Sequence, residues 1–189
     1  MKTYTIIAGV NGTGKSSLSG VLKKERGELG AIIDVDKIAV EHQCGALQAG
    51  RIAVARMEEA LAQGQSFAQE TTLSGARTQR FVRQAKEKGY TVRLCYIGLD
   101  SAEESIKRIQ NRVAKGGHYI DQADVNRRFA KRFADLLKVL PYCDNAYFYS
   151  NENGFTVVAE YMNGDITSIY EPKPDWLNDL MDMVTKKVE

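Results

Sequence analysis

The chain has 189 residues, of which 43% are hydrophobic and 26% charged, a composition typical of one soluble globular domain with a real core. Its 26 basic and 24 acidic residues give a formal net charge of +2, which argues against nucleic-acid binding as the main function. No stretch approaches the roughly 20 apolar residues of a membrane span, and the opening apolar run is too short for a signal peptide, so we expect a cytoplasmic protein.

The first 150 residues alternate between β-rich and helical segments. The β-rich segments, which we expect to form strands, are residues 3–8, 31–35, 66–69, 90–97 and 146–150. The helical segments are residues 16–26, 37–63 (interrupted near Gly45 or Gly50), 75–87, 102–115 and 124–140. Strands that alternate with helices predict a three-layer α/β domain, here with a mainly parallel five-stranded sheet over residues 1–150.

The pattern changes after Pro141. Residues 154–161 and 166–170 flank Asn163-Gly164, which is a strong signal for a β-hairpin, and residues 175–188 read as a final helix. A segment of about 38 residues rarely forms an independent core. We therefore expect residues 151–189 to be a hairpin and helix appended to the same domain.

Residues 9–16 read Gly-Val-Asn-Gly-Thr-Gly-Lys-Ser and fit the pattern G-x-x-x-x-G-K-[ST] in full, between an expected strand and an expected helix. Glycines let successive backbone N–H groups approach phosphate oxygens, and the helix that follows adds its positive N-terminal dipole. Lys15 reaches the β- and γ-phosphates in this motif, and the Ser16 hydroxyl binds Mg²⁺. The residues expected to bind the nucleotide phosphates are Gly9, Asn11, Gly12, Thr13, Gly14, Lys15, Ser16 and Ser17.

A phosphate loop alone is compatible with kinases, GTPases and ATP-driven machines. The guanine-selecting pattern N-K-x-D is missing from the sequence, and large ATPases need far more chain. A small domain with arginine-rich helices late in the sequence favours a small-molecule kinase, because phosphoryl transfer depends on positioning and charge neutralisation.

Beyond the phosphate loop, several motifs resemble the zeta-toxin family of P-loop kinases, over nearly the whole chain. They are A-G-V-N-G-T-G-K-S-S-L (8–18), I-D-V-D-K-I-A (33–39), G-Q-S-F-A-Q-E-T-T-L-S (64–74), Y-T-V-R-L-C-Y-I-G-L-D (90–100), R-I-Q-N-R-V-A-K-G-G-H (108–118) and R-R-F (127–129). The resemblance implies an ATP- and Mg²⁺-dependent kinase that phosphorylates a hydroxyl of a UDP-activated amino sugar such as UDP-N-acetylglucosamine, and an antitoxin protein as a partner. Small relatives carry Y-D-N-S after the last parallel strand, where this chain has Tyr149-Ser150-Asn151-Glu152.

The acceptor side of the expected site contains several oxygen-bearing side chains. Asp36 matches the position of the family's catalytic base, and it is also compatible with a helix N-cap before Lys37. Glu70 ends the third expected strand, where α/β domains bind ligands, and would contact acceptor hydroxyls or support Mg²⁺ through water. Thr71 and Thr72 would hold acceptor or phosphate oxygens. A capping cluster before the helix that follows Gly75 is the alternative for these three residues.

The helix–loop–helix over residues 102–140 resembles a kinase lid that carries arginines to the phosphates. Arg108 and Arg112 lie on one helical face, and Arg128 lies in the next helix. A guanidinium stays charged and binds oxygens bidentately, so Arg112 and Arg128 join Lys15 and Asp36 as catalytic candidates, with Arg108 at the nucleotide. His118, after Gly116-Gly117, is a candidate substrate contact. A solvated basic face is the alternative for the set.

The sequence does not point to a single function. The chain is also compatible with an NTP-binding regulatory or partner-binding module with little turnover, with a kinase of another small hydroxyl acceptor, or with a kinase of nucleic-acid ends. The presence of Asp36, Glu70 and several arginines favours catalysis, because a switch does not need an acceptor site.

Overall fold

The computed structural model describes residues 1–26, 29–117 and 119–185. The strands are β1 (Thr3–Ala8), β2 (Ala31–Ile33), β3 (Phe67–Thr71), β4 (Thr91–Ile97), β5 (Asn145–Ser150), β6 (Thr156–Met162) and β7 (Asp165–Ser168). The helices are α1 (Lys15–Arg26), α2 (Val35–Glu41), α3 (Ala46–Gln63), α4 (Arg77–Glu87), α5 (Ala102–Val113), α6 (Gln122–Leu136) and α7 (Asp175–Thr185), with a 3₁₀ turn η1 (Leu140–Tyr142). Within these described segments, no helix has the length and apolar character needed to cross a bilayer.

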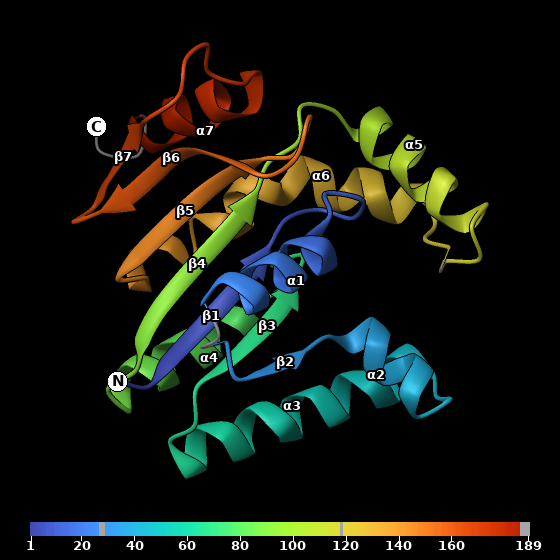
Figure 1. Ribbon diagram of the computed structural model, residues 1–189, viewed down its shortest axis with the longest axis vertical. Coiled ribbons are helices and arrows are strands. Elements are labelled where there is room, and N and C mark those ends of the chain that lie inside the picture. The colour runs from blue at the N-terminus through green and yellow to red at the C-terminus, as the bar shows by residue number, and fades with distance from the viewer. Residues whose placement is uncertain (27–28, 118, 186–189) are drawn as a thin grey trace.

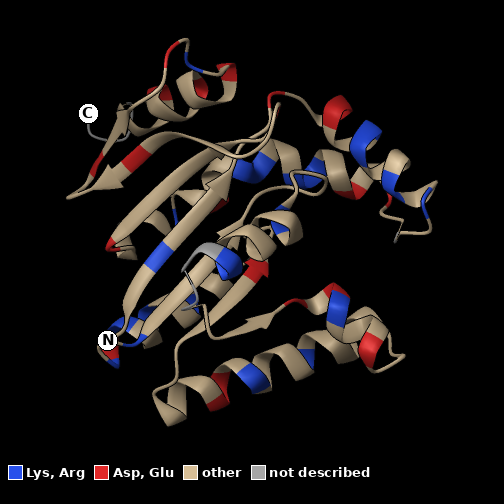
Figure 2. Ribbon diagram, viewed as in Figure 1, with Lys and Arg blue, Asp and Glu red and all other residues tan. Residues whose placement is uncertain are grey.

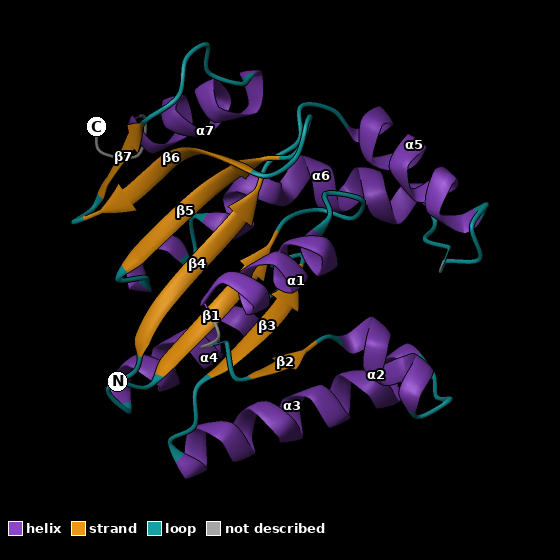
Figure 3. Cartoon of the chain, viewed as in Figure 1, coloured by secondary structure: helices purple, strands orange, loops and turns teal. Residues whose placement is uncertain are grey.

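All seven strands belong to one sheet with the order β2-β3-β1-β4-β5-β6-β7. The first five are parallel, which confirms the predicted α/β fold with a parallel core (Figure 3). The expected hairpin exists, and β6 pairs antiparallel with β5, so that Phe148 lies opposite Ala159. The hairpin therefore extends the main sheet to seven strands.

The sheet lies between two helical layers. Side chains alternate along β1, so that Tyr4 and Ile6 join the larger core under α3, α4, α6 and α7, whereas Ile7 faces the opposite side. There it packs with Leu18 and Leu22 of α1, which crosses in front of the sheet in Figure 1. This arrangement confirms the predicted three layers and brings the start of α1 to the carboxyl end of β1.

Several element boundaries differ from the expected ones for local reasons. The strand expected over residues 31–35 ends at Ile33, because the Asp34 side chain caps α2 by accepting the backbone N–H of Asp36 at 2.9 Å. The alternative role of Asp36 as N-cap is therefore wrong. The expected helical stretch 37–63 is interrupted at Gly45, as predicted, and splits into α2 and α3.

The C-terminal helix packs directly against the end of β4. Trp176 is 1% exposed, and its backbone N–H donates to Asp100 Oδ1 at 2.9 Å. A Cβ atom added to Gly98 would lie 2.1 Å from the Trp176 indole, so only glycine leaves room for this ring. The α7 helix is thus fixed to the strand next to β1.

Replacing Gly98 by alanine is expected to lower the free energy of unfolding by about 1–3 kcal/mol, because the new methyl group collides with the indole. Denaturant unfolding measures the loss. In a Trp176→Leu background the same Gly98→Ala change should cost much less, since the smaller side chain leaves space. Additive losses in the double variant would contradict this explanation.

Candidate active site

A cleft of about 930 Å³ opens at the carboxyl ends of β1, β2 and β3, the edge where parallel α/β sheets bind ligands. It brings together most of the predicted site residues: Asn11, Gly12, Gly14, Lys15, Ser16, Ser17, Asp36, Glu70, Thr71, Thr72, Arg108, Arg112 and Arg128. Asp34 also lines the cleft. Gly9 and Thr13 belong to the same loop but do not line the cleft, and Thr13 is fully buried. His118 lies outside the described residues.

Lys15 lies across its own loop. Its ammonium group donates to the carbonyl oxygens of Gly9 and Val10, each at 2.9 Å. Burial lowers the pKa of Lys15 to about 8, although the carboxylates of Glu70 and Asp36 act in the opposite direction. A lysine with this pKa is about half charged near pH 8 and loses the rest of its charge as the pH rises further.

Affinity for ATP should therefore fall as the pH rises through the pKa of Lys15. The charged form binds phosphate, so we expect the dissociation constant of ATP to rise about tenfold between about pH 7 and about pH 9. Isothermal titration at about pH 8 in two buffers of different ionisation enthalpy should show proton uptake on binding. In a Lys15→Arg variant, whose guanidinium stays charged, both effects should disappear. A flat pH profile in the wild type would contradict this assignment.

Glu70 connects β3 to the first helix. Its Oε2 accepts the Ser16 hydroxyl at 2.7 Å, and its Oε1 accepts the Ser19 hydroxyl at 2.7 Å. Lys37 Nζ lies 3.7 Å from Oε1. Ser19 was not predicted, although its position three residues after Ser16 places both hydroxyls on one face of α1, and this spacing was the available signal.

The oxygens of Ser16 and Glu70 fit a hard divalent cation such as Mg²⁺, which prefers oxygen ligands and keeps several waters. In the part of the chain that the structure describes, no group of three or more His, Cys, Asp or Glu side chains could hold a metal ion by itself. A cation here would therefore depend on phosphate oxygens as well as on Ser16.

Two carboxylates lie at the start of α2. Asp34 is 8% exposed, and one of its oxygens is occupied by the N-cap hydrogen bond. Its pKa is raised by burial and by the nearby charge of Glu70. Asp36, two residues further on, is exposed toward the cleft, and its carboxylate makes no hydrogen bond or ion pair with other described residues. Among the described residues, Asp36 is thus a cleft carboxylate with neither oxygen in a hydrogen bond or ion pair.

The predicted lid arginines approach the phosphate loop in different ways. Figure 2 shows basic residues along both α5 and α6. Arg128 donates from Nη1 to Asn11 Oδ1 at 2.9 Å, and Arg112 lines the cleft and lowers the pKa of Lys15. Arg108 instead donates from Nη2 to Glu104 Oε1 at 2.5 Å and to the carbonyl oxygen of Asn151 at 2.9 Å.

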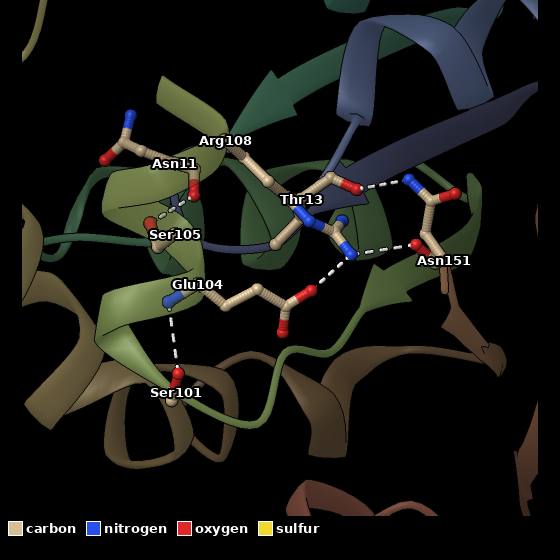
Figure 4. Close-up of polar contacts among 7 residues, drawn as sticks. All are labelled: Asn11, Thr13, Ser101, Glu104, Ser105, Arg108 and Asn151. Atoms are coloured by element: carbon tan, nitrogen blue, oxygen red, sulfur yellow. Dashed lines mark hydrogen bonds and ion pairs between the residues drawn. The ribbon is translucent and has the colours of Figure 1, made fainter. Parts of the chain in front are cut away.

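Two further side chains contact the phosphate loop and were missed by sequence reasoning. Ser105 of α5 donates to the carbonyl oxygen of Asn11 at 2.6 Å, and Asn151, just after β5, donates to that of Thr13 at 2.9 Å (Figure 4). Both are far from the loop in sequence, so that no local spacing could reveal the contacts.

Comparisons with known proteins identify a matching family model and similar proteins. The family model described as zeta toxin matches residues 1–139. A protein of Haemophilus influenzae is 35% identical over 126 residues, which cover 64% of this chain and 88% of the relative.

Among solved structures, a chain from the PezAT chromosomal toxin–antitoxin system of Streptococcus pneumoniae is similar with a TM-score of 0.65 at 16% identity, over 99% of this chain and 86% of that one. The structure of AvrRxo1-ORF1:-ORF2 with ATP gives a TM-score of 0.62 at 18% identity, over 100% of this chain and 63% of that one. At these identities the likeness concerns the fold.

Proposed function

Because the chain belongs to the zeta-toxin family, we propose that it is an ATP-dependent kinase that transfers the γ-phosphate to a hydroxyl group of a small acceptor. The main support is that one cleft contains both a phosphate loop with Lys15 and the carboxylate of Asp36, which makes no hydrogen bond or ion pair with the residues that the structure describes. A nucleotide switch needs the first feature but not the second.

In the proposed reaction, the groups that line the cleft divide phosphate binding, charge neutralisation and proton transfer among them. The loop N–H groups and Lys15 Nζ bind the phosphate chain of ATP, and the guanidinium groups of Arg112 and Arg128 neutralise the charge that develops on the moving phosphoryl group. An Asp36 oxygen accepts the proton of the acceptor hydroxyl. Mg²⁺, when bound, offsets phosphate charge, and Ser16 would hold it, with Glu70 as an outer partner through water.

We propose a nucleotide sugar such as UDP-N-acetylglucosamine as the acceptor. Glu70 and Thr71 end β3, Thr72 follows it, and all three line the cleft. Both oxygens of Glu70 accept hydrogen bonds from Ser16 and Ser19, whereas the hydroxyls of Thr71 and Thr72 suit the hydroxyls of a sugar. Family membership supports this class of acceptor, and the chemistry of these side chains is compatible with it.

The experiment incubates the purified protein with ATP, Mg²⁺ and a panel of nucleotide sugars, free sugars and nucleic-acid ends. Mass spectrometry of the products then tests both the kinase activity and the identity of the acceptor. A phosphorylated nucleotide sugar, absent with Lys15→Ala, is the expected product. Phosphorylation of another acceptor would support the proposed kinase activity and contradict the proposal that the acceptor is a nucleotide sugar. ATP binding with no product from any acceptor would favour a binding module with little turnover.

We also propose an antitoxin protein as a partner. The fold neighbour PezAT is described as a toxin–antitoxin system, which supports the idea for a chain of the same family. Growth arrest on expression of this chain, relieved by a co-expressed neighbouring gene product that co-purifies with it, is the expected result. Normal growth at full expression would argue against toxicity.

A further inference from the structure

Two carbonyl groups of the phosphate loop, those of Asn11 and Thr13, accept hydrogen bonds from side chains that do not line the cleft. Ser105 is fully buried, and its hydroxyl donates to the Asn11 carbonyl oxygen at 2.6 Å. Asn151 donates from Nδ2 to the Thr13 carbonyl oxygen at 2.9 Å. Neither Ser105 nor Asn151 lines the cleft, and Figure 4 shows the contacts of both side chains with the loop.

These two contacts fix the direction of two loop N–H groups. A trans peptide is planar, so that its C=O and N–H groups point in opposite directions. The Asn11 carbonyl shares its peptide with the N–H of Gly12, and the Thr13 carbonyl shares its peptide with that of Gly14; both peptides are trans. Holding the carbonyls on the outside therefore turns the N–H groups of Gly12 and Gly14 away from Ser105 and Asn151.

The two N–H groups are available to a ligand. Gly12 and Gly14 both line the cleft. Within residues 1–26, 29–117 and 119–185, neither N–H donates a hydrogen bond to another protein group. Backbone N–H groups of this kind in a glycine-rich loop bind the oxygens of a phosphate chain.

Asn151 is itself firmly placed. A Cβ atom on Gly14, whose φ is +97°, would lie 2.6 Å from Asn151 Nδ2, so the amide rests directly against the loop. The Asn151 carbonyl oxygen accepts Arg108 Nη2 at 2.9 Å, and Arg108 is paired with Glu104 at 2.5 Å. Asn151, just after β5, is thus held by Arg108 of α5 and in turn contacts the phosphate loop.

We propose that Asn151 and Ser105 are positioning residues of the phosphate site, each of which orients one donor of the loop: Asn151 the N–H of Gly14, and Ser105 the N–H of Gly12. In this arrangement Arg108, which also lines the cleft, holds Asn151 through its carbonyl oxygen. The proposal rests on the proposed function only in that the ligand is a phosphate chain, and its test measures binding without phosphoryl transfer.

The test uses Asn151→Leu and Ser105→Ala, with Asn153→Leu as the matched control, because Asn153 is exposed in the same turn. Dissociation constants of ATP and of inorganic pyrophosphate are measured by isothermal titration. Loss of one oriented donor should raise the dissociation constants of both ligands by about fivefold to tenfold. The control should bind as the wild type does.

Amide NMR provides the readout that a general structural defect would not produce. On addition of pyrophosphate, Asn151→Leu should lose the shift of the Gly14 resonance and keep that of Gly12, while Ser105→Ala should do the reverse. Ser105→Thr, which keeps the hydroxyl, should restore the Gly12 shift. Wild-type affinity in Asn151→Leu, or equal loss of both shifts in either variant, would overturn the proposal.

Discussion

Replacement of Asp36 by asparagine is expected to lower the rate of phosphoryl transfer by about 10²–10⁴-fold, the usual contribution of a positioned general base. Asparagine keeps the size of the side chain but cannot accept the proton of the acceptor hydroxyl. The α2 helix should remain intact, because its N-cap is Asp34 and not Asp36. ATP affinity should stay near the wild-type value.

Steady-state kinetics and isothermal titration on the same preparation separate these two effects. Glu41→Gln is the matched control, because Glu41 lies exposed at the other end of α2 and pairs only weakly with Arg56 at 3.5 Å. Undiminished turnover in Asp36→Asn would show that Asp36 is not the general base. Asp34, the other carboxylate lining the cleft at this point, would then be tested in its place.

Replacement of Arg128 by alanine is expected to lower the turnover number by about 10³-fold, the lower range for an arginine that neutralises a transferring phosphoryl group. Arg128 already lies beside the loop through its 2.9 Å hydrogen bond to Asn11 Oδ1. The Michaelis constant for ATP should change less than the turnover number, because the charge develops mainly in the transition state.

The neighbouring Arg127 supplies the matched control. It is 62% exposed in its side chain, pairs with Asp124 and does not line the cleft, so Arg127→Ala should have little effect. Equal losses in the two variants would show that α6 needs its basic charge in general. A larger effect on ATP affinity than on turnover would place Arg128 in ground-state binding.

The fold was predictable from sequence because its strongest signals are local. Alternating strands and helices were sufficient to predict the three-layer domain, and Gly45 marked the break between α2 and α3. The pairing of β6 with β5 depends on which strand edge is free after the parallel sheet has formed. That information is spread over the whole chain, so the hairpin was predicted without its place in the sheet.

The candidate site also combines residues with a local sequence signal and residues without one. The phosphate loop is a continuous motif, and Asp36 and Glu70 could be expected near the cleft because each comes at or just after the end of a recognisable strand. Asn151 and Thr13 are 138 residues apart, and a contact over that distance leaves no periodic pattern in a single sequence. The role of Arg108 was expected at the nucleotide, whereas the structure places its guanidinium between Glu104 and the Asn151 carbonyl.

The position of Asn151 has a consequence for protein synthesis. A ribosome that has released residues 1–139 has already made the complete stretch matched by the family model, including the phosphate loop. The residue that orients Gly14 is added only afterwards, and Trp176, which packs on Gly98, comes later still. A nascent chain that stops before Asn151 therefore contains the whole phosphate loop but lacks the side chain that we propose orients the N–H of Gly14. We expect such a chain to bind ATP more weakly than one that includes Asn151.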